Sequence, residues 1–266
     1  MRSIRLILVL FITATLATKF TPHVHAACSK EFTVGFMEID PGYRTSKSTT
    51  PRGRDLEIFD KVMLHAECSY TLTKMPWKRV IVAIKNGIID ATISASNTPD
   101  RQTFALFSRA FRHETMAIFM RRSEISSLSV NSLHDIINSN LNIGVHLGSW
   151  YGETFHTAII RNPKFRKRVL QSSDFRFLHN WLLIGRVDVV LDELHSGLNY
   201  VHDNNIEDKV WYHPTSAHEN PVHFMFSKAT VTQRDVDQID QALNAFLTTN
   251  EYSALMKRFS STSTKP

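Results

Sequence analysis

Short apolar runs alternate with amphipathic helical patterns along most of the chain. The run over 32–36 predicts a buried strand, and the apolar positions of 56–66 recur at the three- and four-residue spacing of a helix. A second helix is predicted from Trp77 to a stop at Gly87, and a strand over 88–93 follows it. This alternation of strands and helices is typical of α/β proteins.

The second half of the chain repeats this pattern. Its predicted strands cover 141–145 and 187–191, and its predicted helices are one opened by Gly148 and Ser149, one over 177–184, a long one over 236–247 and a shorter one ending at 259. From residue 260 onward the chain is predicted to be a frayed tail.

The N-terminal residues have the layout of a secretory signal peptide. Two arginines near the start precede an apolar run over 6–17, and the small residues Val24 and Ala26 precede a cleavage site predicted after Ala26. The alternative is a membrane anchor, but spanning a bilayer takes about 20 apolar residues, more than this run supplies. Residues 1–26 are therefore predicted to be removed, and the mature protein is predicted to be periplasmic.

Composition and charge exclude several classes of protein. With 42% hydrophobic and 21% charged residues, the chain is neither disordered nor collagen-like. Removing the three basic residues of 1–26 leaves 28 basic against 25 acidic residues, so the net charge falls from +6 to +3. No concentrated basic patch remains, and nucleic acid is not predicted as a partner. The five-residue spacing of His213, His218 and His223 puts no two on one helix face, so no metal site is predicted.

Export also bears on the two cysteines, Cys28 and Cys68. In an oxidising compartment a disulfide between them is favoured, and it would close a loop of about 40 residues, corresponding to roughly 4 kcal/mol in the chain-entropy model. The alternative is a lipid anchor on Cys28, since Ala27 precedes it as a lipid-attachment signal requires. His25, however, stands where such a signal has an aliphatic residue.

The most specific pattern of the chain lies over 77–111. Its matching residues are Gly87, Asp90, Thr98, Pro99, Asp100, Arg101, Phe107, Ser108 and Phe111. In order and spacing they resemble the motifs G-x-x-D, S/T-x-T-P-E-R and F-S-x-P-Y of the bacterial extracellular solute-binding proteins, family 3, with Ala110 in place of the usual Pro. These proteins are the periplasmic receptors of polar amino acid importers. In the second half, 145–149 resembles the family's V-x-x-G-T turn and 185–190 its G-R-x-D-A-V motif.

The resemblance implies an α/β fold of two lobes, the type II periplasmic-binding-protein fold. Two mixed sheets flanked by helices would face each other across a ligand cleft. Mapping the family pattern onto this chain places the first lobe at 27–112 plus 223–266 and the second at 117–213. The hinges would then lie near 113–116 and 214–222.

The resemblance also implies a site for a carboxylate. A guanidinium grips a carboxylate with two parallel hydrogen bonds, and the family arginine that matches Arg101 holds the ligand α-carboxylate. Ser94 and Ser96 fall at family positions that assist it, and their spacing puts both on one face of a strand end. Gly148 and Ser149 would complete the cradle, because a glycine turn opening a helix presents free backbone N–H groups.

Four further residues are candidates for the rest of the ligand. Trp77 falls where family members stack an aromatic ring on the ligand, and Tyr43, in the loop after the first strand, is a second apolar wall. The family commonly places an ammonium-binding Asp five residues beyond the Asp of its G-R-x-D motif. That count reaches Glu193 here, with Asp192 adjacent, and either carboxylate could neutralise an ammonium group.

The function implied is that of a non-enzymatic receptor. It would close on a small polar amino acid or related carboxylate and deliver it to the permease of an ABC importer in the inner membrane, as a monomer without a cofactor. One alternative is a periplasmic dehydratase acting on cyclohexadienyl acids, which needs a general acid, for which Glu153, His146 or Glu193 could serve. Another is a ligand-sensing subunit that acts in trans.

Overall fold

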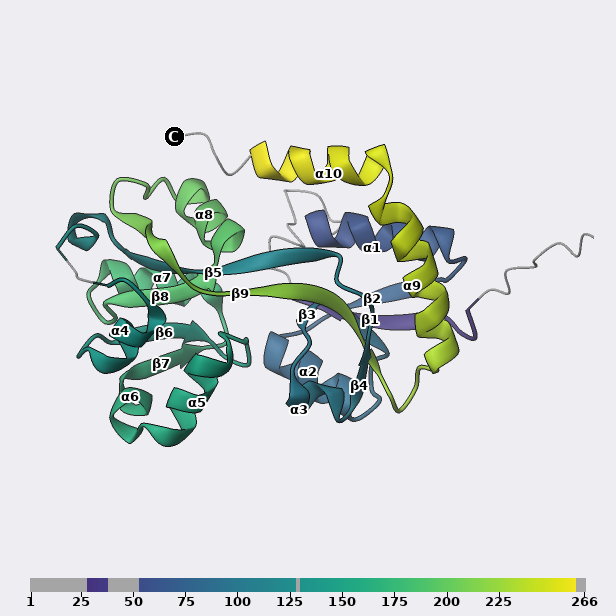
Figure 1. The fold of residues 1–266 in the computed structure, drawn as a ribbon, viewed down its shortest axis with the longest axis horizontal. Helices are drawn as coiled ribbons and strands as arrows, with labels where there is room; N and C mark the ends of the chain where they lie inside the picture. Colours follow the sequence, from purple (N-terminus) through teal and green to yellow (C-terminus); the bar gives the residue numbers. More distant parts are fainter. Residues whose placement is uncertain (1–27, 38–52, 128–129, 262–266) are drawn as a thin grey trace, which may run out of the picture.

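Two long antiparallel strands, β5 (Arg112–Arg121) and β9 (Val210–Ser227), run through the middle of the molecule and connect its two lobes (Figure 1). The fold is that of a computed structural model, which describes residues 28–37, 53–127 and 130–261. The predicted signal peptide and Tyr43 lie outside the described residues. Within the described part, none of the helices combines the length and apolar character that a bilayer crossing needs.

The first lobe contains the four strands before β5, the first three helices and the two C-terminal helices. Its strands are β1 (Phe32–Phe36), β2 (Tyr70–Lys74), β3 (Ala91–Ser96) and β4 (Ala105–Phe107). Its helices are α1 (Arg54–His65), α2 (Trp77–Lys85), α3 (Pro99–Gln102), α9 (Gln233–Leu247) and α10 (Asn250–Ser261). In Figure 1, α9 and α10 lie on the outer side of this lobe, next to α1.

The second lobe contains the elements between β5 and β9. Its strands are β6 (Ile143–His146), β7 (Val169–Ser172) and β8 (Val189–Glu193). Its helices are α4 (Leu133–Asn138), α5 (Glu153–Arg161), α6 (Pro163–Arg168), α7 (Phe175–Leu183) and α8 (Leu194–Asp203), and a short 3₁₀ helix covers Arg122–Glu124.

The strands form one continuous nine-stranded mixed sheet rather than two separate ones. Its order is β2-β1-β3-β9-β5-β8-β6-β7, with β4 paired to β9. The sheet is continuous because the two segments that cross between the lobes pair with each other, with Glu114 opposite Asn220 and Met116 opposite His218. The predicted hinges, 113–116 and 214–222, fall within these two strands, and the lobe boundaries stay a prediction.

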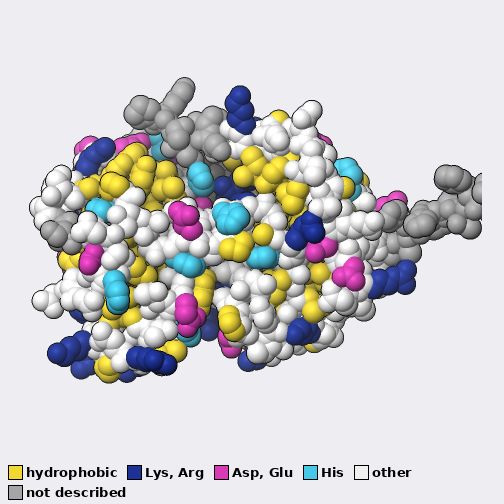
Figure 2. Space-filling model, in the orientation of Figure 1, with side chains coloured by type: hydrophobic (Ala, Val, Ile, Leu, Met, Phe, Trp, Pro, Cys, Tyr) yellow, Lys and Arg dark blue, Asp and Glu magenta, His cyan; other side chains and the backbone are white. Residues whose placement is uncertain are grey.

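Alternation along the strands builds the core on both sides of the sheet. In the second lobe, Ile118 and Met120 of β5 pack toward α4 and α5, whereas Ala117 and Phe119 pack toward α7 and α8. In the first lobe, α1 and α9 cover β1 and β3, and their buried leucine, isoleucine, valine and phenylalanine side chains form one cluster. On the face shown in Figure 2, basic and acidic side chains are interspersed, and histidines lie along the middle.

Several predicted elements are confirmed and three need correction. β1 has the predicted bounds, and α1, α2, α7 and α9 lie where periodicity placed them. The strand predicted from 88 begins only at Ala91, because Gly87 ends α2 with a φ of +67° and Ile88 stays exposed. The helix predicted to open at Gly148 begins at Glu153, and α10 continues to Ser261, past the predicted start of the tail.

The structure joins Cys28 and Cys68 by a disulfide, with their Cα atoms 5.0 Å apart. The bond ties the segment before β1 to the turn after α1. The same segment is held to α9, because the backbone N–H and the hydroxyl of Ser29 both donate to Asp235. The N-terminal end of the first lobe is therefore fixed covalently and by hydrogen bonds.

Reducing this disulfide is expected to lower the free energy of unfolding by up to about 4 kcal/mol, the loop-closure entropy of a cross-link spanning about 40 residues. Urea unfolding with and without dithiothreitol measures the effect. The variant carrying Cys28→Ser and Cys68→Ser is the control, because its unfolding midpoint should not respond to dithiothreitol. An unchanged midpoint for the wild-type chain on reduction contradicts the expectation.

Candidate ligand-binding cleft

A cavity lies between the two lobes, at the side of the β5–β9 pair. Six of the predicted site residues line it: Trp77, Ser94, Ser96, Arg101, Ser149 and Glu193. Further residues that line it were not predicted, among them Arg112, Glu114, Trp150, Tyr151 and Phe175. Gly148 and Asp192 are not among the described residues that line the cavity.

Arg101 is positioned by the short helix α3. Thr98 is the N-cap of this helix, and its hydroxyl accepts a hydrogen bond from the backbone N–H of Arg101 at 3.3 Å. The side chain is 6% exposed, and burial lowers the pKa of Arg101 to about 10, a shift that Glu114 opposes. Arg101 therefore carries its positive charge at neutral pH, inside the cavity.

Arg101 and Trp77 reach across the cleft to one backbone carbonyl of the second lobe. Nη2 of Arg101 and Nε1 of Trp77 donate to the carbonyl oxygen of Gly148 at 3.1 and 2.9 Å. Nη1 of Arg101 donates to the carbonyl oxygen of Ser96 at 2.9 Å. Gly148 has a φ of +88°, a conformation that favours glycine. At this turn a carbonyl oxygen of Gly148, rather than an N–H group, thus meets the first lobe.

Replacing Trp77 by phenylalanine is expected to favour the open form of the cleft. Phenylalanine keeps an aromatic ring at this position but has no N–H donor for the Gly148 carbonyl oxygen. The loss of one hydrogen bond corresponds to a change of about three- to tenfold in the open-to-closed ratio. Small-angle X-ray scattering measures this as a larger radius of gyration. Trp181→Phe, on α7 away from the cavity, is the control. Identical scattering curves for Trp77→Phe and the wild-type chain contradict the expectation.

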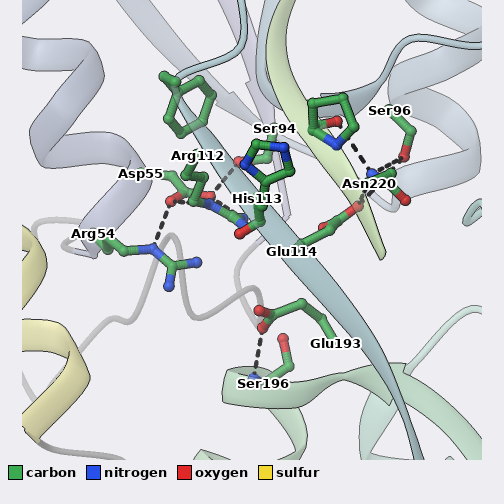
Figure 3. A network of polar contacts seen from close by, with 12 residues as sticks. Arg54, Asp55, Ser94, Ser96, Arg112, His113, Glu114, Glu193, Ser196 and Asn220 are labelled. Carbon is green, nitrogen blue, oxygen red and sulfur yellow. Dashed lines mark hydrogen bonds and ion pairs between the residues drawn. The ribbon is translucent and has the colours of Figure 1, made fainter. Parts of the chain in front are cut away.

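A buried ion-pair cluster lies beside the cavity (Figure 3), and its members Arg112 and Ser94 line the cavity. Asp55 of α1 is fully buried and accepts hydrogen bonds from Arg112 of β5, at 2.8 and 2.5 Å, and from Arg54 at 2.9 Å. The hydroxyl of Ser94 donates to the same carboxylate at 2.7 Å. Burial would raise the pKa of Asp55, but Arg112 and Arg54 hold it far below its ordinary value.

Glu114 lies on β5, opposite Asn220 of β9, and lines the cavity. Its Oε1 accepts hydrogen bonds from the amide of Asn220 at 2.8 Å and from the hydroxyl of Ser96 at 3.4 Å. Burial raises the pKa of Glu114 above its ordinary value, although Arg112 opposes the shift. Arg112 and Glu114 lie two positions apart on β5, which puts both side chains on one face of the strand, and this spacing just after Phe111 is the sequence signal that could have identified them.

Asp192 and Glu193 are neighbours on β8 and point to opposite sides of the sheet. Glu193 lines the cavity, where Oε2 accepts a hydrogen bond from the backbone N–H of Ser196 at 2.8 Å and caps α8. Its Oε1 is buried and has no hydrogen-bond partner among the described residues. Asp192 is turned away and accepts a hydrogen bond from Nε2 of His179 at 3.0 Å.

Of the three predicted general-acid candidates, only Glu193 lines the cavity. Glu153 is exposed at the start of α5, and His146 is 1% exposed behind Ser149. In the described residues, no group of three or more histidine, cysteine or carboxylate side chains is arranged to hold a metal ion.

Comparison with known proteins agrees with this architecture. The sequence model of the bacterial extracellular solute-binding proteins, family 3, matches residues 33–262. The chain belongs to this family. No curated protein sequence matches the chain.

Solved structures share the fold at low sequence identity. A histidine kinase sensor domain with similarity to periplasmic binding proteins has a TM-score of 0.74 and 15% identity, covering 86% of this chain and 96% of its own. The arginine-, lysine-, histidine-binding protein ArtJ from the thermophilic bacterium Geobacillus stearothermophilus has a TM-score of 0.71 and 20% identity, over 86% and 95%. An ancestral amino acid-binding protein, a precursor of cyclohexadienyl dehydratase, has a TM-score of 0.69 and 15% identity, over 86% and 95%. The solute-binding protein described here therefore has the type II periplasmic-binding-protein fold.

Proposed function

We propose that this solute-binding protein captures a small amino acid or related carboxylate in the cleft, in the periplasm, for uptake by an ABC importer. One observation carries the proposal. The positive charge of Arg101, from the first lobe, and the carboxylate of Glu193, from the second, line the same cavity, and one Glu193 oxygen has no hydrogen-bond partner among the described residues.

The two charges are complementary to a zwitterion. Arg101 has five N–H donors, of which two are used for carbonyl oxygens in the protein, so a carboxylate can still be gripped by the guanidinium. Glu193 offers an acceptor to an ammonium group. Since the two side chains come from different lobes, a ligand that touches both stabilises the closed form, which couples binding to hinge closure.

Family membership, the predicted signal peptide and the known ligands of solved relatives support the transport role. ArtJ is described as an arginine-, lysine-, histidine-binding protein. A closed, monomeric receptor of this kind would present its ligand to the permease of an inner-membrane importer.

The proposal is tested by a thermal-shift panel on ligand-stripped protein, using the twenty L-amino acids and a set of small mono- and dicarboxylates. One or a few compounds are expected to raise the melting temperature, because a ligand that binds only the folded state stabilises it. Glu193→Gln should abolish the shift by amino acids, whereas Glu153→Gln, an exposed glutamate outside the cavity, should retain it. A panel without any shift contradicts the proposal.

A catalytic function is the second candidate, and Glu114 is the observation that favours it. A buried carboxyl group with a raised pKa, facing a cavity that also holds an arginine, has the properties of a general acid. One solved relative is a precursor of cyclohexadienyl dehydratase. Release of phenylpyruvate from prephenate, or of phenylalanine from arogenate, and loss of this turnover in Glu114→Gln would establish the enzyme.

A further inference from the structure

In the second-lobe wall of the cavity, the lining residues Ser149 and Tyr151 are hydrogen-bonded to His146, which lies buried behind them. We propose that His146 fixes the direction of the Ser149 hydroxyl, so that Ser149 only accepts hydrogen bonds from a ligand and thereby selects N–H groups over carboxylates. The proposal rests on the proposed function, because it assigns the part of the ligand that faces the second lobe.

The contacts of His146 determine which of its ring nitrogens carries the proton. Its Nε2 lies 3.2 Å from the carbonyl oxygen of Ser173, which can only accept, so Nε2 must carry the proton. The ring is 1% exposed and stacks on Phe175 with centroids 3.9 Å apart. Burial lowers the pKa of His146 to about 4, against the opposing influences of Ser173 and Asp174, so the ring is neutral at pH 7. Its Nδ1 is therefore a lone-pair acceptor.

The Ser149 hydroxyl is directed toward His146. Nδ1 of His146 lies 3.1 Å from Oγ of Ser149, so the hydroxyl proton of Ser149 is the one that this nitrogen accepts. The hydroxyl oxygen of Tyr151 accepts the backbone N–H of His146 at 2.7 Å, so the side chains of both Ser149 and Tyr151 are tied to His146. The hydroxyl proton of Ser149 is thereby used within the protein. The oxygen of Ser149 then presents lone pairs to the cavity.

The backbone of the Gly148–Ser149 turn also presents an acceptor to the cleft. The N–H of Ser149 donates to the carbonyl oxygen of His146 at 3.3 Å, and Gly148 presents its carbonyl oxygen to the first lobe. Both the N–H and the O–H of Ser149 are used within the protein, so we infer that this turn offers acceptors to a ligand rather than the predicted carboxylate cradle. Glu193, whose Oε1 has no hydrogen-bond partner in the part of the chain that the structure describes, adds a second acceptor to the same cavity. An ammonium or amide group satisfies both acceptors, whereas a carboxylate meets lone pairs.

A serine beside a histidine also resembles a nucleophile and its base. Burial keeps the pKa of His146 near 4, and a group this weakly basic takes up a proton poorly at neutral pH. The pair therefore serves as a fixed hydrogen-bond acceptor and not as a catalytic dyad.

The protonation state is tested without a ligand. Long-range ¹H–¹⁵N NMR of the full chain at pH 7, with His146→Gln used to assign the signals among the 13 histidines, is expected to show Nε2 protonated and Nδ1 bare. A proton on Nδ1 overturns the proposal, whatever the ligand is.

The selectivity is tested by calorimetry with three pairs of probes: L-glutamate and glutarate, L-glutamine and glutaramate, and L-arginine and 5-guanidinopentanoate. Each second compound lacks only the α-amino group. For a pair that binds, Ser149→Ala is expected to weaken the affinity for the amino acid by about tenfold, the effect of one hydrogen bond to a charged group. The affinity for the analogue without the α-amino group should stay unchanged.

Variants of His146 separate a specific role from a structural one. His146→Phe keeps the stacking but frees the Ser149 hydroxyl, and it is expected to reduce the preference for the amino acid over its analogue to a similar degree. His146→Gln supplies a new acceptor for the hydroxyl and is expected to restore part of this preference. In the Ser149→Ala background, His146→Phe should no longer change the preference. An unchanged preference in Ser149→Ala or in His146→Phe overturns the proposal. If neither these probes nor the larger panel bind the wild-type chain, the proposed function fails, while the spectrum still decides the state of His146.

Discussion

Replacing Asp55 by alanine is expected to lower the free energy of unfolding by about 3–5 kcal/mol, the cost of leaving a buried charge without its partner. Asp55 is fully buried, and two guanidinium groups, those of Arg54 and Arg112, donate to it. Both arginine side chains are less than 8% exposed. Without the carboxylate, their positive charges face each other in an environment from which water is largely excluded.

Urea unfolding followed by circular dichroism measures this loss. Glu251→Ala is the matched control, because it also removes a carboxylate paired with a basic residue, Lys61, but in an exposed pair where solvent screens the interaction. It should leave the midpoint close to that of the wild-type chain. Similar midpoints for Asp55→Ala and Glu251→Ala would show that the buried cluster does not hold α1 and β5 together.

The same cluster gives stability a defined dependence on pH. The pKa of Asp55 is lower in the folded chain than in the unfolded one, where it is close to the ordinary value of 3.8. Its contribution is therefore complete above this value and is lost as the pH falls toward the folded-state pKa. Asp55→Ala should lack this part of the acid sensitivity.

The burial of Asp55 could not be predicted from the sequence. An aspartate in the first turn of a helix is ordinarily a solvated residue that favours the helix dipole. Its burial depends on Arg112, 57 positions along the chain, and on Ser94 of another strand. No periodicity or motif links these residues, because the contact exists only after β3 and β5 take their places in the sheet.

Local patterns predicted elements well where one face is apolar. β1 and α1 follow from such patterns, because burial of one face determines both the periodicity and the structure. β9 was not predicted, since its middle part carries polar residues such as His218 and Asn220 at the crossing between the lobes. There the strand is stabilised by pairing with β5 rather than by a buried face.

The candidate site was predictable where order and spacing of motifs carried it. Arg101 and Trp77 line the cavity at the positions that the family pattern indicated. Adjacent residues of a strand face opposite sides of the sheet, so the register of β8 decides which of Asp192 and Glu193 faces the cavity. The sequence alone does not specify this register. The direction of the Gly148 carbonyl group depends on the backbone conformation of this residue, which has a φ of +88°. No sequence motif specifies that conformation.

Replacing Arg101 by lysine is expected to weaken binding of the ligand identified by the thermal-shift panel by at least about 100-fold, since two charge-assisted hydrogen bonds each contribute about 1.5–3 kcal/mol. Lysine keeps the positive charge but has one nitrogen, so it cannot grip a carboxylate with two parallel N–H groups. The planar guanidinium can donate to the carbonyl oxygens of Ser96 and Gly148 and to a ligand at the same time, and the single ammonium group of lysine cannot reproduce this geometry.

Isothermal titration calorimetry of the wild-type chain, Arg101→Lys and Arg79→Lys decides the prediction. Arg79 is an exposed arginine on α2 that does not line the cavity, so its replacement should leave the affinity unchanged and control for the general effect of exchanging the two side chains. The melting temperature of ligand-free Arg101→Lys shows whether the fold is retained. If Arg101→Lys is folded and binds as tightly as Arg79→Lys, charge alone suffices at this position, and the carboxylate is held by other donors of the cleft.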